Sequence, residues 1–301
     1  MKIYIKSHKT HAGKWIYAGY ARAWEELGYD VEFFDSLKQI NDNDYAIMIP
    51  DGAIEEAHVD VIQRSKKTYI YTQPNSFPEP WGSHPNFRCG CSDSLIQKIN
   101  EMQNTVLWSW VNFDDNFKEK YYSNWKEVQI IPLAFDPISY KKMKNKDYEY
   151  DICFVGGWVN NGFNEKKKIM LEYFKHLMRS NLKCGIFVGK NISDEQENLI
   201  LYNSKLALNI HDNYQRVLGL DTNERTFKSL GLTGALVCDK IQAVTDLFSE
   251  LPTYESPQEM MTIIERYLSN DKLLRETKKH YRNEIRENHT YAHRVRQLLD
   301  L

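Results

Sequence analysis

The stretch NERTFKSLGLTGALVCDKIQAVTDLF, residues 223–248, decides the fold class. Its pattern predicts a short helix, a turn at Gly234, a buried strand over residues 235–239 and a second short helix. In the first helix the apolar residues, among them Phe227, are spaced to pack inward. A buried strand between two helices is typical of α/β proteins.

The start of this first helix carries a cation. Asp221, Thr222 or Asn223 can cap the helix, which places Arg225 in its first turn. A cation there opposes the helix dipole, at a cost of a few tenths of a kcal/mol to about 1 kcal/mol. Arg225 therefore needs an anionic partner, and either Glu224 or a ligand can supply it.

Alternating strand and helix patterns extend from this stretch along the whole chain. In the second half, strands are predicted at 151–157, 183–189 and 205–210, with helices at 164–179 and 194–204. In the first half, strands are predicted at 2–6, 45–50, 68–72, 105–110 and 127–133, and a helix after the first strand ends at Gly28. This alternation predicts parallel sheets.

The organisation predicted is that of two lobes. The chain has 301 residues, and the basic, polar segment 140–151 interrupts the pattern near its middle. We expect a first α/β lobe over residues 1–140, a second over 150–285, and a C-terminal helix over 286–301 that packs back on the first lobe. Ligands bind at the carboxyl ends of the strands in open α/β sheets, so a cleft between the lobes is expected to hold the chemistry.

Composition excludes several classes of protein. The net charge of −2, from 39 Lys and Arg against 41 Asp and Glu, excludes a globally basic nucleic-acid binder. Five cysteines without a CxxC pair indicate buried thiols in a reducing compartment. The sequence shows no apolar run of signal-peptide or membrane-spanning type, so a cytoplasmic location is expected.

A glycine pair follows the first strand of the second lobe. Gly156 and Gly157 can let backbone N–H groups approach a phosphate, and the next helix begins near Lys166. The same residues also fit a tight turn before a solvated lysine face. The planar fork of Arg225 suits a diphosphate, because it can bind two oxygens at once.

These motifs, in this order and spacing, resemble the C-terminal lobe of GT-B glycosyltransferases. The shared features are the glycine pair, the basic helix start at Lys166, the run Asn223-x-Arg225-x-Phe227, and the segment from Gly234 to Asp239. The resemblance is strongest to the CgeB-like group with the group 1 C-terminal lobe. The whole chain is more loosely similar to the DNA β-glucosyltransferases of T-even phages. Either resemblance implies the GT-B fold, with two Rossmann-like α/β lobes, a cleft and a C-terminal helix.

The resemblance implies a donor site on the second lobe. A nucleotide-diphosphate sugar, with a UDP-sugar favoured, would bind without a metal or cofactor, and Arg225 and Lys166 would face its diphosphate beside Gly156 and Gly157. Asn223 and Glu224 complete the expected set. The family commonly has a glutamate for the ribose hydroxyls where this chain has Lys228, so Glu224 substitutes for it, or the donor is held differently, or catalysis is lost.

The first lobe is expected to supply the acceptor site and any catalytic base. His11, in the predicted loop 7–15, is the first candidate for the base and Asp51 is the second. A histidine in such a loop also fits a surface position or a phosphate contact. His8 and His11 lack a third ligand in a metal-binding motif, so no metal is expected.

Gln73 and Trp81 are expected to contact the acceptor together with His8. Gln73 falls where the phage enzymes have an aspartate base. An amide cannot accept a proton at neutral pH, so Gln73 is not expected to be the base.

The resulting hypothesis is a hexosyl- or pentosyltransferase acting on a hydroxyl of a surface-glycan precursor. The alternative acceptor is a hydroxymethylated base in DNA, which the basic clusters 64–67 and 140–146 would favour. A nucleotide-sugar epimerase and a non-catalytic sugar-binding relative remain open as further alternatives. The oligomeric state is not predicted.

Overall fold

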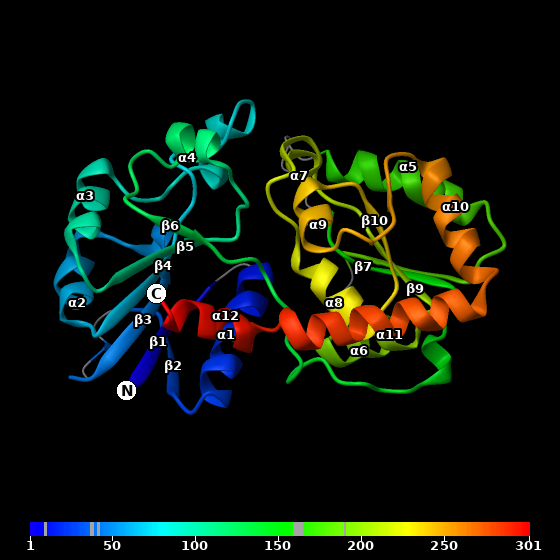
Figure 1. Ribbon diagram of the computed structural model, residues 1–301, viewed down its shortest axis with the longest axis horizontal. Helices are drawn as coiled ribbons and strands as arrows, with labels where there is room; N and C mark the ends of the chain where they lie inside the picture. The colour runs from blue at the N-terminus through cyan, green and yellow to red at the C-terminus, as the bar shows by residue number, and fades with distance from the viewer. Residues whose placement is uncertain (9–10, 37–38, 41–42, 159–164, 190) are drawn as a thin grey trace. The chain divides into compact units, whose positions relative to one another are not determined.

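The computed structural model describes residues 1–301 except 9–10, 37–38, 41–42, 159–164 and 190, and it does not describe the side chain of His11. The chain divides into two compact units (Figure 1). The first unit comprises Met1–Pro132 with Tyr291–Leu301, and the second comprises Leu133–Thr290. Each unit is built on one parallel β-sheet.

The sheet of the first unit has six strands in the order β2-β1-β3-β4-β5-β6. All its neighbouring strands are parallel. The strands are β1 Lys2–Lys6, β2 Asp30–Phe34, β3 Tyr45–Pro50, β4 Lys67–Tyr71, β5 Thr105–Ser109 and β6 Val128–Ile130. The middle strands are apolar on both faces, as a parallel sheet with helices on both sides requires.

Helices cover both faces of this sheet. On one face Ile47, Ile70 and Leu107 pack with Ile96 of α3 in one core cluster. The helices contributing to this cluster are α2 Val59–Arg64, α3 Asp93–Glu101 and, through partly buried Phe117, α4 Asp115–Tyr121. On the other face lies α1 His11–Glu26, with α12 Tyr291–Leu299 against it.

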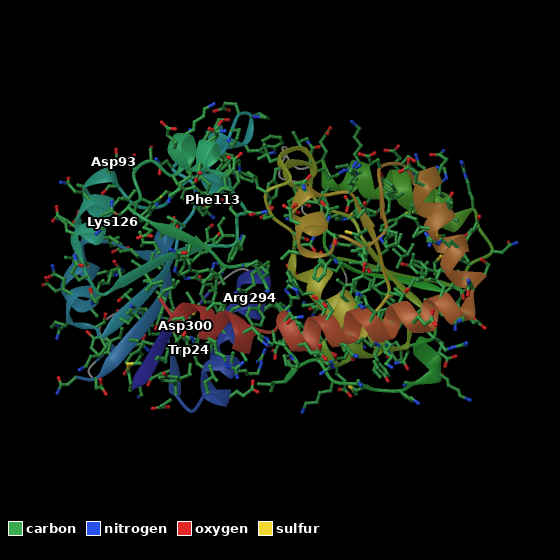
Figure 2. The ribbon with its side chains drawn as sticks, in the orientation of Figure 1. Trp24, Asp93, Phe113, Lys126, Arg294 and Asp300 are labelled. Atoms are coloured by element: carbon green, nitrogen blue, oxygen red, sulfur yellow. The ribbon has the colours of Figure 1, made fainter. Side chains whose placement is uncertain are left out.

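The α1–α12 contact depends on a small residue and on buried aromatic rings. A Cβ at Gly19 of α1 would collide with the Tyr291 ring of α12. Tyr20 of α1 contacts the Tyr291 ring, at a centroid distance of 4.8 Å. Trp24 and Arg294, labelled in Figure 2, are also buried, and Arg294 Nε donates a hydrogen bond to the Pro132 carbonyl.

The sheet of the second unit has the strand order β11-β10-β9-β7-β8. The strands are β7 Ile152–Gly156, β8 Cys184–Val188, β9 Leu206–Asn209, β10 Leu236–Asp239 and β11 Thr253–Tyr254. The helices are α5 Lys166–Met178, α6 Asp194–Asn203, α7 Asn213–Leu218, α8 Glu224–Leu232, α9 Gln242–Leu247, α10 Pro257–Leu268 and α11 Asp271–Asn288. Helices α5 and α10 contact each other, as do α6 and α11 with α8.

The strand order of each sheet defines a switch point, where consecutive connections leave in opposite directions. In the first unit it lies between β1 and β3, and in the second between β7 and β9. Ligands of open α/β sheets bind at the carboxyl ends of strands at such points. The predicted α/β class is confirmed. We expect functional side chains at the carboxyl ends of the strands beside these two switch points.

The sequence prediction is wrong at two boundaries in the first unit. Residues 7–15 were expected to form a loop, but α1 begins at His11. Gly13 in its first turn leaves room for the His8 ring, which a Cβ at this position would meet. The last strand was expected over 127–133, whereas β6 covers only Val128–Ile130 at the edge of the sheet.

Candidate functional site

Arg225 lies at the switch point of the second sheet. It is the second residue of α8, and its Nε donates to the Val155 carbonyl at the end of β7, at 2.7 Å. Its Nη1 donates to Asn209 Oδ1 at the end of β9, at 2.9 Å. The guanidinium also lies over the Phe154 ring, 4.7 Å from its centroid. Arg225 therefore bridges the two strands that flank the switch point.

Gly156 makes this position of Arg225 possible. A Cβ on residue 156 would collide with the guanidinium, so only glycine leaves room for it. A Cβ on Gly157 would have no atom of the other described residues within 4 Å. The two glycines of the pair therefore differ in their surroundings, and only the first is required by contacts within the protein.

Arg225 keeps N–H donors beyond those bonded to Val155 and Asn209. A guanidinium has five N–H groups, and Arg225 uses two of them for contacts with the residues that the structure describes. Asn223 is the N-cap of α8, as expected, but its side chain bonds Asn209 instead of capping the helix amides. The N–H groups of a helix's first turn and a partly exposed guanidinium together form a site suited to an anion.

Lys166 is held inside the second unit. Only 4% of its surface is exposed, and its Nζ lies 3.0 Å from Asp212 Oδ1 and donates to the Ile210 carbonyl. Burial lowers the pKa of the Lys166 ammonium, Asp212 opposes this shift, and Arg225 adds to it. Lys166 thus fixes the segment after β9, and its expected contact with a diphosphate stays a prediction.

Lys228 is also buried and paired. Its Nζ lies 3.3 Å from Glu197 Oε2 of α6 and 5.1 Å from the centroid of the Tyr140 ring. Glu197 Oε2 accepts a second hydrogen bond from the Tyr140 hydroxyl, at 2.9 Å. Burial tends to raise the pKa of the neighbouring Glu224 carboxyl, but Lys228 and Arg225 hold it below its usual value. A positive environment thus surrounds Glu224.

The sequence did not point to a fully buried pair behind Arg225. His211 follows β9 and Asp239 ends β10, and their side chains meet at 2.6 Å, from Nδ1 to Oδ1. Burial tends to raise the pKa of the Asp239 carboxyl, but the charge and hydrogen bonds of His211 hold it below its usual value. The available signal was a polar residue at the end of each of two apolar runs, 205–210 and 235–239.

Within the described residues, one group of three side chains could reach a metal ion together: His211, Cys238 and Asp239. Both ring nitrogens of His211 already form hydrogen bonds, to Asp239 and to the Thr222 hydroxyl at 2.7 Å. Metal binding would have to break one of these buried bonds. The group therefore fits a hydrogen-bonded core better than a metal centre.

In the first unit Asp51 follows β3 at the switch point. Its carboxylate is 3% exposed and accepts the Gln73 backbone N–H at 2.8 Å. Burial raises the pKa of Asp51 to about 6. Hydrogen bonds from the backbone of Gln73, the Cys89 thiol and the backbone of Gly52 and Gly90 act in the opposite direction and lower this pKa. Asp51 thereby ties together the segments that follow β3 and β4.

His8 lies on the other side of this switch point, after β1. Its ring stacks on Tyr17 of α1, with centroids 5.6 Å apart, and burial and Lys6 lower its pKa. The buried Tyr17 hydroxyl has no hydrogen-bond partner among the described residues. Burial raises the pKa of Tyr17, and Tyr20 and Asp51 raise it further. His8, Tyr17, Asp51 and Gln73 therefore gather at one edge of the sheet.

Two other predicted residues stand apart from this group. Trp81 is 4% exposed, so its ring serves packing within the first unit. The side chain of His11 lies outside the described residues, and only its backbone place at the start of α1 is known. Acceptor contact by Trp81 and base catalysis by His11 stay predictions.

Comparison with known proteins decides the family. A sequence model of a family described as glycosyl transferase-like matches residues 141–300, more than half of the chain. The chain belongs to this family. No curated protein matches it in sequence.

Solved structures of glycosyltransferases share the fold of this glycosyl transferase-like chain. An α-glucosyltransferase in complex with UDP and a 13-mer DNA has a TM-score of 0.60 at 13% identity, covering 100% of this chain and 99% of its own. A mutant of the T4 phage β-glucosyltransferase in complex with UDP-glucose has 0.57 at 14% identity, covering 98% and 97%. TarM has 0.52 at 10% identity, covering 88% and 56%.

These likenesses confirm the predicted GT-B fold class and the predicted resemblance. A further structure of the T4 phage enzyme, with a TM-score of 0.54 at 12% identity, was solved with UDP and Mn²⁺. In the described part of the chain, no helix is long and apolar enough to cross a membrane.

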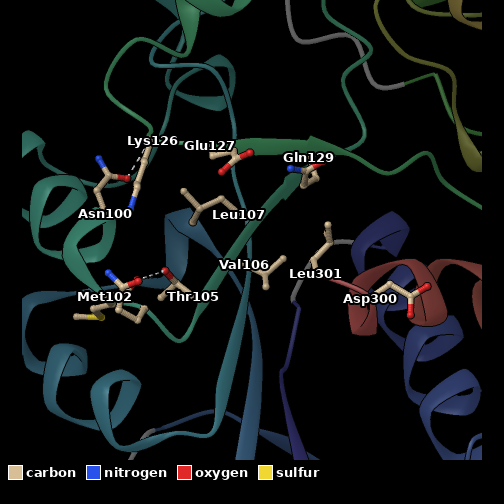
Figure 3. A pocket seen from close by; sticks show the side chains of 11 residues that line it. Asn100, Met102, Thr105, Val106, Leu107, Lys126, Glu127, Gln129, Asp300 and Leu301 are labelled. Atoms are coloured by element: carbon tan, nitrogen blue, oxygen red, sulfur yellow. Dashed lines mark hydrogen bonds between the residues drawn. The ribbon is translucent and has the colours of Figure 1, made fainter.

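The first unit also contains a pocket of about 360 Å³ (Figure 3). It is lined by the start of β5, including Thr105, and by Asn100, Lys126 and Asp300. At the wall of this pocket Asn100 Oδ1 accepts the Lys126 backbone N–H, and the Met102 carbonyl accepts the Thr105 hydroxyl. The pocket lies at the amino ends of the strands, opposite the edge that carries Asp51.

Proposed function

We propose that this protein is a glycosyltransferase that moves a sugar from a nucleotide-diphosphate sugar, a UDP-sugar first, to a hydroxyl acceptor. The observation that carries the proposal is Arg225, held at the β7–β9 switch point with N–H groups to spare. The leaving diphosphate gains negative charge in the transition state. Preorganised donors stabilise such charge strongly, because they need not reorient during the reaction.

The donor site proposed is centred on Arg225 and the first turn of α8. The Arg225 fork binds diphosphate oxygens, Gly156 and Gly157 let the backbone come close, and Glu224 accepts ribose hydroxyls. Lys166 adds positive charge from behind and fixes the loop at Asp212. With this charge in place we propose that transfer does not require a metal ion.

Asp51 and His11 are the proposed candidates for the base. A pKa of about 6 means that most Asp51 carboxyls are ionised at pH 7 yet more basic than an ordinary aspartate. The grouping of Asp51 with His8 and Gln73 at the switch point supports an acceptor site there. For His11, support comes from its position at the start of α1, beside that edge.

The donor half of the proposal is tested by isothermal titration calorimetry with UDP-, GDP-, dTDP- and ADP-glucose, with and without EDTA. Arg225→Ala should weaken binding of the preferred donor by about 10- to 100-fold, the range for one charged hydrogen bond. Arg179→Ala is the matched control. This arginine is exposed and caps the C-terminal end of α5, whereas Lys166 of the proposed donor site begins that helix. Unchanged affinity in Arg225→Ala would refute the proposed clamp.

The acceptor is proposed to be a surface-glycan precursor, in keeping with the net charge of −2. DNA is the second candidate, because the basic clusters 64–67 and 140–146 are present and one structural neighbour was solved with UDP and DNA. Release of nucleoside diphosphate is measured with glycan acceptors and with hydroxymethylated DNA at about 50 and 200 mM salt. A DNA reaction should fall steeply with salt, whereas conversion of the donor without any acceptor would indicate an epimerase.

A further inference from the structure

The buried pair of His211 and Asp239 connects to Arg225 through a chain of hydrogen bonds. His211 Nε2 lies 2.7 Å from the Thr222 hydroxyl, which lies 2.6 Å from the Thr226 hydroxyl. Thr226 Oγ1 accepts from Asn209 Nδ2 at 2.9 Å. Asn209 Oδ1 in turn accepts from Arg225. All members except Arg225 are buried, with 0–6% of their surfaces exposed.

The chemistry of Arg225 fixes the orientation of the Asn209 amide in this chain. Arg225 can only donate, so Asn209 must present its Oδ1 to Arg225 and its Nδ2 to Thr226. Because Thr226 Oγ1 accepts from Asn209, its proton is available for Thr222. The Thr222 hydroxyl can donate or accept, so it bonds His211 Nε2 whichever of the two atoms carries the proton.

The last link holds the histidine ring in place. His211 Nδ1 lies 2.6 Å from Asp239 Oδ1 and donates its proton to that carboxylate. Asp239 also accepts the backbone N–H of His211, at 3.0 Å, so it has the acceptors that this arrangement needs. Every hydroxyl, amide and ring nitrogen of the chain is thereby satisfied, as buried polar groups require.

We propose that Asp239, His211 and Thr222 are positioning residues that hold Arg225 ready for a diphosphate, an inference that rests on the proposed function. They act by fixing the orientation of the Asn209 amide. If that amide turned over, Nδ2 would face Arg225 Nη1, and two donors would meet. Arginine loses rotamer entropy when it is fixed, so an anchored guanidinium binds a ligand at lower entropic cost.

The test breaks the chain at Thr222, between His211 and Thr226. Thr222→Val keeps the side-chain shape and removes the hydroxyl, and Thr222→Ser restores the hydroxyl. Binding of UDP is measured by calorimetry in both variants, alone and combined with Arg225→Ala. We expect Thr222→Val to weaken UDP binding by about 3- to 10-fold, Thr222→Ser to restore it to within about 2-fold, and Thr222→Val to have no further effect once Arg225 is gone.

A second readout does not depend on the donor. The Arg225 Nε–H is bonded to the Val155 carbonyl, so its NMR signal should be sharp and protected from exchange in the wild type. Thr222→Val should broaden or shift this signal, while Arg179 signals stay unchanged. If no nucleotide binds the wild type, the proposed function fails, yet this signal still decides the inference.

Two results would overturn the inference. One is an equal loss of UDP affinity from Thr222→Val with and without Arg225, because the effect would then bypass the guanidinium. The other is a Thr222→Val variant that lowers the urea midpoint of unfolding but leaves both UDP affinity and the Arg225 signal unchanged. Either would show that the chain only stabilises the core.

Discussion

Gly156→Ala should destabilise the protein only while Arg225 is present. The added Cβ would occupy the place of the guanidinium, so Arg225 must leave its bonds to the Val155 carbonyl and Asn209. Hydrogen bonds from a charged donor contribute about 1.5–3 kcal/mol each. Part of this is regained by solvation, because Arg225 is partly exposed, and we expect a net loss of about 2–4 kcal/mol in the free energy of unfolding.

The assay is urea unfolding of four proteins: wild type, Gly156→Ala, Arg225→Ala and the double variant. Removing the arginine side chain removes the obstacle, so Gly156→Ala should cost less than about 0.5 kcal/mol in the Arg225→Ala background. Gly157→Ala is the matched control, because a Cβ there meets no atom of the residues that the structure describes, and its cost should stay within about 0.5 kcal/mol. Equal costs of Gly156→Ala in both backgrounds would refute this account of the glycine.

Three further predictions concern stability in urea. The pKa of Asp51 is about 6 in the folded protein against 3.8 as its ordinary value, so its contribution to stability is complete below about pH 4 and is lost as pH rises through 6. The advantage of Asp51→Asn over wild type should therefore grow by about 3 kcal/mol between pH 4 and 7, and a pH-independent difference would contradict this. Lys228→Glu should lower the free energy of unfolding by about 3–5 kcal/mol, because Glu197 loses its cation. The double variant Lys228→Glu with Glu197→Lys should recover much of this stability. A double variant as unstable as Lys228→Glu alone would show that the ion pair does not cause the loss. Gly19→Ala should cost about 1–3 kcal/mol by overpacking against Tyr291, and an unchanged midpoint would show that α12 shifts freely.

The fold could be predicted because each element carries its own local signal. The strand β3 was predicted at its observed bounds, since a continuous apolar run flanked by polar residues leaves little choice. Helix α7 was missed although its ends carry local signals. Asp212 and Gln215 form a capping box, and Gly219 ends the helix with a φ of 68°. That miss came from overlooking turn chemistry and not from a lack of information.

In the candidate site, residues with a local sequence signal could be predicted, and contacts between residues distant in the sequence could not. Arg225 could be found from its place in the first turn of a helix, because the conflict with the dipole is local. The pairing of His211 with Asp239 depends on β9 and β10 being neighbours, and the two residues are 28 positions apart. The ion pair of Lys166 with Asp212 likewise joins residues that are far apart in the sequence. The pattern of a single sequence does not show which distant segments become neighbours in the fold.

Lys228 shows why a departure from a family pattern is hard to interpret without the structure. Read alone, a lysine in place of the expected glutamate suggests that the donor site is lost. In the structure, the carboxylate that meets position 228 comes from Glu197, on α6, so a charge pair is present there. The bonds that hold Arg225 come instead from β7 and β9. A lysine at 228 therefore leaves the bonds of the proposed diphosphate anchor at Arg225 in place, and the change is expected to alter recognition of the ribose before it alters binding of the phosphates.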